Sequence, residues 1–311
     1  MQMQESRAPA AIAQRGKASL TSSWIMASRP HTLMIGVNPV LVGCALAWAD
    51  TRHIDVGLML LSMLGALLLQ TGTNLDNDVS DFERGTDRAG RRGLPRATAL
   101  GLLTPGQVRT ASRLCFAVAT VVGLMLAWLG GWPIFVAGVA SAAAAMSYSG
   151  GPRPISYTPF GDFVVWLFFG LVAVTGTYYL QTLSVSPGVL VAATMVGLPA
   201  AAVLVVNNYR DLDPDRVVGK RTLAVCFGRA FTRWQYAVLV VAPFVLLPLL
   251  GLQTRVGPSL FVPLLALPTA IALVRRFWSE APGPSFNPVL AQTARFQVMF
   301  AVFLSVAILL A

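Results

Sequence analysis

Long apolar runs, separated by short polar segments, make up most of the chain. A helix needs about 20 predominantly apolar residues to cross the hydrocarbon core of a bilayer. Runs of that kind lie near 32–49, 57–77, 110–130, 132–149, 161–181, 188–208, 234–252, 258–275 and 288–310. No polar segment between them is long enough to form a separate soluble domain. The pattern predicts an all-α integral membrane protein of about nine transmembrane helices, in which residues 1–311 form one domain.

Composition supports the membrane assignment and excludes several kinds of site. The chain is 55% hydrophobic and 12% charged, whereas soluble domains average about 25% charged residues. Its three cysteines, Cys44, Cys115 and Cys226, have no spacing typical of a metal site or a disulfide framework. The two histidines, His31 and His53, are too far apart in sequence to suggest a metal site. The polar first thirty residues do not resemble a signal peptide.

The basic residues predict the orientation. If the N-terminus is cytoplasmic, all of the 23 Lys and Arg residues except Arg52 and Arg255 fall in cytoplasmic segments, as the positive-inside rule requires. The net charge of +10 is then explained by topology and by attraction to anionic lipid headgroups, and nucleic-acid binding is not needed to account for it. We expect a cytoplasmic N-terminal segment, 1–28, and two long cytoplasmic loops, 78–109 and 209–233. No obligatory protein partner is inferred.

Both long loops begin with acidic and amide side chains. The first follows an uncharged run and reads NLDNDVSDFERGTDR. In it, Asn74, Asn77, Asp78 and Asp81 have the spacing of one helical stripe. We expect Asp76 and Glu83 to lie on the solvated side of that helix. In the second loop Asn207, Asp211 and Asp215 are spaced four residues apart, although Pro214 can end or kink a helix there.

Acidic side chains this close together repel one another, and a divalent cation removes that repulsion. A set of oxygen ligands without His or Cys suits Mg²⁺, which usually keeps several waters and joins one or two carboxylates to substrate phosphates. Basic residues near both stretches can neutralise the remaining phosphate oxygens. The sequence therefore predicts a diphosphate held by Mg²⁺ at one membrane face, with a lipid tail that extends between the helices.

Two other interpretations remain open from these residues alone. The stretches can be ordinary solvated loops, although the same polar arrangement occurs twice, each time at the end of a long apolar run. An ion-coupled transporter also carries acids in its membrane domain. Its sites usually lie near the midplane on broken helices, whereas these acids cluster at the predicted cytoplasmic face.

Four stretches resemble the UbiA-type intramembrane prenyltransferases, and in particular the branch that acts on 1,4-dihydroxy-2-naphthoate in menaquinone biosynthesis. They are RPHTL at 29–33, NDVSDFERGTD at 77–87, GPRPISY at 151–157 with Gly161-Asp162, and NNYRD at 207–211 followed by GKRTL at 219–223. The resemblance covers roughly residues 25–230. The chain departs from the family pattern in one respect. Other branches carry an Asp four residues after Asp81, whereas this chain has Gly85 there and then Asp87.

This resemblance implies a helical bundle around a cavity that is roofed by the two acidic loops and open sideways to lipid. It also implies Mg²⁺-dependent transfer of a polyprenyl group from its diphosphate to an aromatic acceptor, at the bacterial inner membrane. In the naphthoate branch the prenyl group replaces the carboxylate, which leaves as CO₂. The acceptor stays open between 1,4-dihydroxy-2-naphthoate and those of other branches, such as 4-hydroxybenzoate or homogentisate.

We assign the candidate residues by their expected tasks. The expected metal ligands are Asn77, Asp78, Asp81, Asp87, Asp211 and Asp215. The expected contacts to diphosphate or substrate are Arg84, Arg88, Arg96, Lys220, Arg221, Asn74, Asn207 and Tyr148. The residues expected to matter most for catalysis are Asp81, Asp211, Asn77 and Arg153, where Arg153 is either a guide for the acceptor or diphosphate or only a topological anchor. Tyr148, Tyr178 and Tyr179 are candidates to present an aromatic face to a cationic centre.

Overall fold

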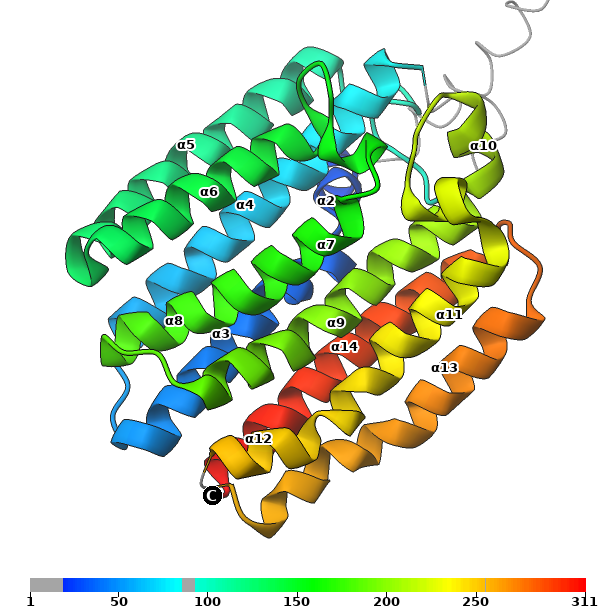
Figure 1. Ribbon diagram of the computed structural model, residues 1–311. Coiled ribbons are helices and arrows are strands. Elements are labelled where there is room, and N and C mark those ends of the chain that lie inside the picture. Colours follow the sequence, from blue (N-terminus) through cyan, green and yellow to red (C-terminus); the bar gives the residue numbers. More distant parts are fainter. Residues whose placement is uncertain (1–18, 86–92, 255) are drawn as a thin grey trace, which may run out of the picture.

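Figure 1 shows the protein as a computed structural model that describes residues 19–85, 93–254 and 256–311. Nine helical stretches within these ranges are long and apolar enough to cross a membrane, which confirms the prediction of an all-α, multi-pass membrane protein. They are α3 (Pro30–Thr51), α4 (Val56–Glu83), α5 (Pro105–Gly130), α6 (Trp132–Ser149), α7–η2–α8 (Gly161–Thr182), α9 (Pro187–Arg210), α11–α12 (Leu223–Gln253), η3–α13 (Pro258–Ser279) and α14 (Phe286–Leu309).

Short elements connect or interrupt these spans. The helix α2 (Leu20–Ser28) precedes the first span, and the sequence pattern did not predict it. The fifth span consists of α7 (Gly161–Trp166), the π-helical turns η2 (Leu167–Val172) and α8 (Ala173–Thr182). The seventh joins α11 (Leu223–Val245) to α12 (Leu247–Gln253), and the eighth joins η3 (Pro258–Ala266) to α13 (Leu267–Ser279). Two further elements, η1 (Ile155–Tyr157) and α10 (Leu212–Val217), lie in the connections.

The helix α9 lies at the centre of the bundle and is buried over most of its length. It packs against α7, η2 and α8 on one side and against α11 and α14 on another. Small residues allow the closest of these approaches. A Cβ added to Gly197 would lie 2.6 Å from the Trp166 carbonyl oxygen and 2.9 Å from the Cα of Gly170. The backbones of α9 and the fifth span therefore meet directly at this crossing.

The segments that carry polar chemistry gather at one end of the bundle. In Figure 1 the connection between α6 and α7 and the helix α10 lie at the same end, and the C-terminus lies at the opposite end. The polar stripe of the first acidic stretch remains helical, because α4 continues to Glu83. In the second stretch the chain turns at Asp211, between α9 and α10, and Pro214 lies inside the short helix α10. The Asp215 N–H still donates to the Asp211 carbonyl oxygen at 2.8 Å, so the two aspartates stay one turn apart.

The crossing at Gly197 gives a stability prediction. Gly197→Ala places a methyl group against backbone atoms that cannot rotate away, so we expect the free energy of unfolding to fall by about 1–3 kcal/mol. Gly176→Ala is the matched control, because a Cβ on Gly176 meets nothing within 4 Å. Thermal unfolding in detergent measures both variants. Equal melting temperatures for the two would contradict the close crossing.

Candidate active site

A cavity of about 380 Å³ opens among α3, α4, α6, the fifth span, α9 and α10. Its walls differ from one part to another. The ends of α4 and α9, together with α10, contribute charged and amide side chains, and the remaining walls are largely apolar. The apolar part includes Ile35, Leu69, Phe168, Phe169 and Val172. The cavity therefore offers a polar region continuous with a region suited to a hydrocarbon chain.

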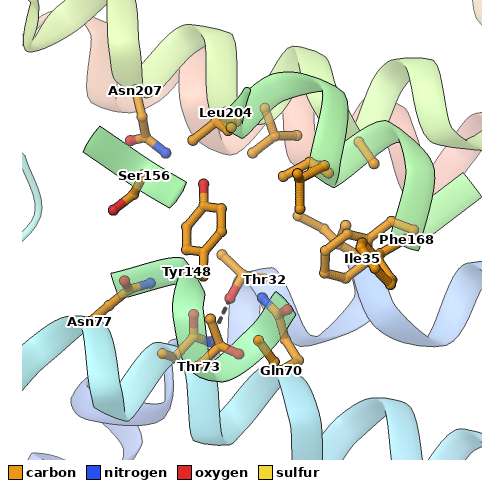
Figure 2. Close-up of a pocket in the computed structure, with 18 of the residues that line it drawn as sticks. Thr32, Ile35, Gln70, Thr73, Asn77, Tyr148, Ser156, Phe168, Leu204 and Asn207 are labelled. Carbon is orange, nitrogen blue, oxygen red and sulfur yellow. Dashed lines mark hydrogen bonds between the residues drawn. The ribbon is translucent and has the colours of Figure 1, made fainter. Parts of the chain in front are cut away.

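Figure 2 shows how side chains from several helices meet in this cavity. Tyr148 reaches between the helices with its hydroxyl group towards Asn207 and Ser156. Asn77 lies on the α4 side, and Phe168 belongs to the apolar side. The structure thus places Tyr148 at the boundary between the polar and apolar parts.

On the α4 side, Asn77 and Asp81 line the cavity one helical turn apart. Asp81 is only 8% exposed and forms an ion pair with Arg96, which is also buried. The Arg96 guanidinium additionally donates to the backbone carbonyl of Asn77. A buried carboxylate needs such a partner, because leaving it unpaired costs several kcal/mol. Arg96 therefore holds the Asp81 carboxylate in the cavity wall and is itself anchored by the Asn77 carbonyl oxygen.

On the α9–α10 side, Asp211 and Asp215 line the cavity. The Arg210 guanidinium donates to both carboxylate oxygens of Asp211, at 2.9 and 2.6 Å. The Lys220 ammonium lies 3.2 Å from the Asp215 carboxylate. Each acid in this half of the cavity thus has its own basic partner.

The environment of Asp215 disfavours its charged form. Burial raises the pKa of its carboxyl group to about 6, the Lys220 ammonium opposes the shift, and the Asp211 carboxylate adds to it. Burial lowers the pKa of Lys220, but Asp215 and Asp81 outweigh that effect, so the pKa of Lys220 is raised overall. Lys220 is therefore charged at neutral pH, and a further cation near Asp215 would stabilise its carboxylate.

The donor set is compatible with Mg²⁺. Within the described ranges, no three acidic, His or Cys side chains converge into a closed metal cluster. The cavity instead presents Asn77 and Asp81 from one side and Asp211 and Asp215 from the other. Mg²⁺ is usually bound by one or two carboxylates together with waters and substrate phosphates. Open sites with hard oxygen donors suit that mode of binding.

Several predicted site residues lie outside the cavity lining. Asp78 is buried, but its carboxylate accepts hydrogen bonds from the backbone N–H groups of Ala97 and Thr98 and from the Thr98 hydroxyl. Arg84 donates to the carbonyl oxygens of Ser149 and Gly151. In this arrangement Asp78 holds the loop that carries Arg96, and its assignment as a metal ligand stays a prediction.

The other assignments also differ in where their residues lie. Arg153 and Arg221 are exposed and do not line the cavity. Asn74 does line it, but its amide donates at 2.9 Å both to the Ser28 carbonyl and to the Thr32 hydroxyl, so it fixes the joint between α2 and α3. Asp87 and Arg88 lie outside the described residues.

Of the two expectations about neighbouring residues, the one for Glu83 is met and the one for Asp76 needs correction. Glu83 is exposed and pairs with Arg109, as expected for the solvated side. Asp76 is not fully solvated, because its Oδ2 is buried without a hydrogen-bond partner. Its Oδ2 lies close to Gly150, because a Cβ added to Gly150 would be 3.3 Å from it.

Of the three candidate tyrosines, only Tyr148 lines the cavity. The Tyr178 hydroxyl donates at 2.6 Å to Asp50. Asp50 lies in the last turn of α3, away from the two acidic segments. Tyr179 packs with an apolar cluster that includes Leu126 and Ile134.

Sequence reasoning did not single out several polar residues of the cavity. Arg210 was counted only as a basic residue near the membrane, although it is the partner of Asp211. The remaining ones are Arg29, Thr32, Gln70, Thr73, Ser141, Ser156, Thr158, Asn208 and Thr222. The adjacent amides of NNYRD were a usable signal for Asn208. The isolated Gln and Thr residues of α4 gave none, because single polar residues are common in transmembrane helices.

A stability measurement tests the hydrogen bond from the Thr98 hydroxyl to the Asp78 carboxylate. Thr98→Val keeps the size of the side chain but removes its hydroxyl donor, and we expect the free energy of unfolding to fall by about 1–3 kcal/mol. Thr120→Val is the control, because the Thr120 hydroxyl is exposed and bonds only within its own helix. The comparison uses thermal unfolding in detergent. A Thr98→Val variant as stable as the control would show that this bond does not hold the loop.

Comparison with known proteins places these features in a family. The sequence profile of the UbiA prenyltransferase family matches residues 37–309. Two proteins named 1,4-dihydroxy-2-naphthoate octaprenyltransferase are similar to the chain. The Mycobacterium leprae (strain TN) protein is 39% identical over 93% of this chain and 97% of its own length. The Escherichia coli (strain K12) protein is 33% identical over 89% of this chain and 92% of its own length.

A solved structure shares the fold. It is a UbiA homolog from Archaeoglobus fulgidus bound to GPP and Mg²⁺, 16% identical to this chain, with a TM-score of 0.69 over 93% of this chain and 100% of that one. The family profile covers most of the chain, and the two octaprenyltransferases align with the chain over nearly their full length. The chain, a multi-pass membrane protein with an acid-lined cavity, therefore belongs to the UbiA prenyltransferase family.

Proposed function

We propose that the protein transfers a polyprenyl group from its diphosphate to 1,4-dihydroxy-2-naphthoate, and that CO₂ and diphosphate are released. The observation that carries this proposal is the cavity itself, in which carboxylates and cations adjoin an apolar space. The names of the relatives at 39% and 33% identity favour the naphthoate as acceptor. The acid-lined polar part suits a diphosphate, and the apolar part suits its prenyl chain.

Mg²⁺ is the proposed cofactor. Asn77 and Asp81 on α4, with Asp211 and Asp215 beyond α9, are the residues that would hold it, and a homolog of the same fold has been solved with Mg²⁺ bound. When bound, Mg²⁺ supplies positive charge that offsets the negative charge developing on the departing diphosphate. The basic partners of these acids then have N–H groups available for phosphate oxygens. All three of these partners, Arg96, Arg210 and Lys220, line the cavity wall.

The remaining walls control the reacting carbon. Departure of diphosphate leaves a cation-like allylic carbon, which water would capture. The apolar side chains of the cavity exclude water, and the Tyr148 ring offers a negative π face to this centre. The aromatic carbon of the acceptor forms the new carbon–carbon bond. The bond to the carboxylate then breaks, its electron pair returns to the ring and CO₂ leaves, so the ring carbon needs no strong base.

We place the protein in the bacterial inner membrane with its N-terminus and both acidic segments on the cytoplasmic side. The distribution of Lys and Arg supports this orientation. The acidic segments lie together at one end of the bundle (Figure 1), so a diphosphate would reach both from the same side.

The acceptor is tested directly. Purified protein with Mg²⁺, a polyprenyl diphosphate and carboxyl-labelled 1,4-dihydroxy-2-naphthoate is expected to release labelled CO₂ and diphosphate in equal amounts. Parallel assays contain 4-hydroxybenzoate or homogentisate instead. Prenylation of 4-hydroxybenzoate without CO₂ release would assign the protein to another branch. Solute flux in proteoliposomes without any prenyl transfer would support a transporter.

The two acids at the cavity mouth give a second prediction. Asp81→Ala and Asp211→Ala are each expected to lower kcat/KM by at least about a hundredfold, because each removes charge that would hold the cation and the diphosphate. Asp213→Ala is the control. Asp213 lies in the same motif, but it pairs with Arg229 and does not line the cavity. Near wild-type turnover of either variant at saturating Mg²⁺ would show that its carboxylate is dispensable.

A further inference from the structure

Tyr157 lies between two basic side chains that come from different acidic segments. It belongs to η1, in the connection between α6 and α7. The Lys220 ammonium lies 5.1 Å from the centre of its ring, and the Arg84 guanidinium carbon lies 5.3 Å from the same centre. Both distances fall within the range of about 6 Å in which a cation is attracted by an aromatic ring. One half-buried ring therefore contacts a cation from the end of α4 and another from the loop after α10.

The backbone anchors this arrangement independently of the ring. The Arg221 N–H donates to the Tyr157 carbonyl oxygen at 2.9 Å, immediately after Lys220 in the chain. On the other side, Arg84 donates to the Gly151 carbonyl oxygen at 2.7 Å. Hydrogen bonds thus join the η1 connection to both acidic segments. Variants of the Tyr157 side chain leave these backbone acceptors in place.

The two cations have different surroundings. Lys220 lines the cavity, whereas Arg84 does not. Apart from the ring, Lys220 forms an ion pair with Asp215, 3.2 Å away, and the Asp81 carboxylate also favours its charged form. A cation bound by Asp215 would weaken that ion pair. The ring contact would remain, and an ammonium group with three N–H donors can contact the ring and still donate to other acceptors.

We propose that Tyr157 is a positioning residue for the diphosphate, because its ring holds the Lys220 ammonium at the cavity wall, from which Lys220 can donate to phosphate oxygens. This inference rests on the proposed function in that the ligand is a prenyl diphosphate. It adds a task for the η1 connection, which joins the two acidic segments into one binding surface. Arg84 supports the ring from the α4 side.

The test uses binding without an acceptor. Isothermal titration of the full-length protein with geranyl diphosphate and Mg²⁺ measures the dissociation constant for wild type and for variants at position 157. Tyr157→Phe keeps the ring and is expected to retain most of the affinity. Tyr157→Leu removes the ring, and the dissociation constant is expected to rise about tenfold. In assays of turnover, the KM for the prenyl diphosphate rises and the KM for the acceptor does not.

A series of fluorinated phenylalanines at position 157 keeps the shape of the side chain, so a loss of affinity cannot be attributed to misfolding. Phenylalanine carrying one, two or three fluorine atoms at position 157 has a progressively weaker π face, and the affinity is expected to fall stepwise with fluorine number. In the Lys220→Met background this dependence is expected to disappear. Phe160→Leu is the matched control, because Phe160 belongs to the same connection, is 67% exposed and does not line the cavity.

Three results would overturn the proposal. The first is an affinity that does not change with fluorine number, and the second is an affinity that still falls with fluorine number in the Lys220→Met background. The third is a loss of affinity in Phe160→Leu equal to that in Tyr157→Leu. These results differ from a failure of the proposed function. The titration contains no acceptor, so a wrong assignment of the naphthoate leaves it unaffected. A wild-type protein that binds no geranyl diphosphate would contradict both.

Discussion

Buried carboxylates at one end of an apolar bundle are the constraint on which the site depends. Asp81 and Asp215 are almost fully buried, and a charge in such a place is stable only beside a partner. Asp81 obtains its partner, Arg96, from the loop before α5. Asp211 and Asp215 pair with residues close to them in the chain, Arg210 at the end of α9 and Lys220 in the loop after α10. The Asp81–Arg96 pair therefore holds the loop before α5 against the end of α4, and the two local pairs complete the charged wall of the same cavity.

The same pairs prepare the cavity for a ligand with several negative charges. Without a ligand, the cations neutralise the carboxylates. A diphosphate with a divalent cation brings charges of both signs, so each side chain can exchange one partner for another without losing its compensation. In the proposed reaction, the apolar walls of the cavity would exclude water from the reacting carbon and accommodate the prenyl chain. Membership of the UbiA prenyltransferase family agrees with this division between a polar mouth and an apolar interior.

The polar stripe on α4 shows how far spacing can be trusted. Asn77 and Asp81 were expected on one face, and both line the cavity. Asp78 belongs to the same predicted stripe but turns to Thr98 instead. Successive residues of a helix point about 100° apart. Adjacent residues such as Asn77 and Asp78 therefore cannot both point directly into one cavity. The loop at Ala97 and Thr98 binds Asp78 on one edge of the stripe, and Asn77 and Asp81 on the other edge face the cavity.

The sequence by itself determined the membrane spans, their number and the two acidic segments, because hydropathy and helical spacing are local properties of the chain. It also indicated Asn77, Asp81, Asp211 and Asp215 as neighbours within each segment. Only the tertiary structure decided which cation accompanies which acid, that Asp78 and Asn74 hold neighbouring segments in place, and that Tyr157 lies between Arg84 and Lys220. Apart from the local pairs Arg210–Asp211 and Lys220–Asp215, these contacts join residues well separated in sequence. They follow from the way the helices pack around α9, which no local pattern records.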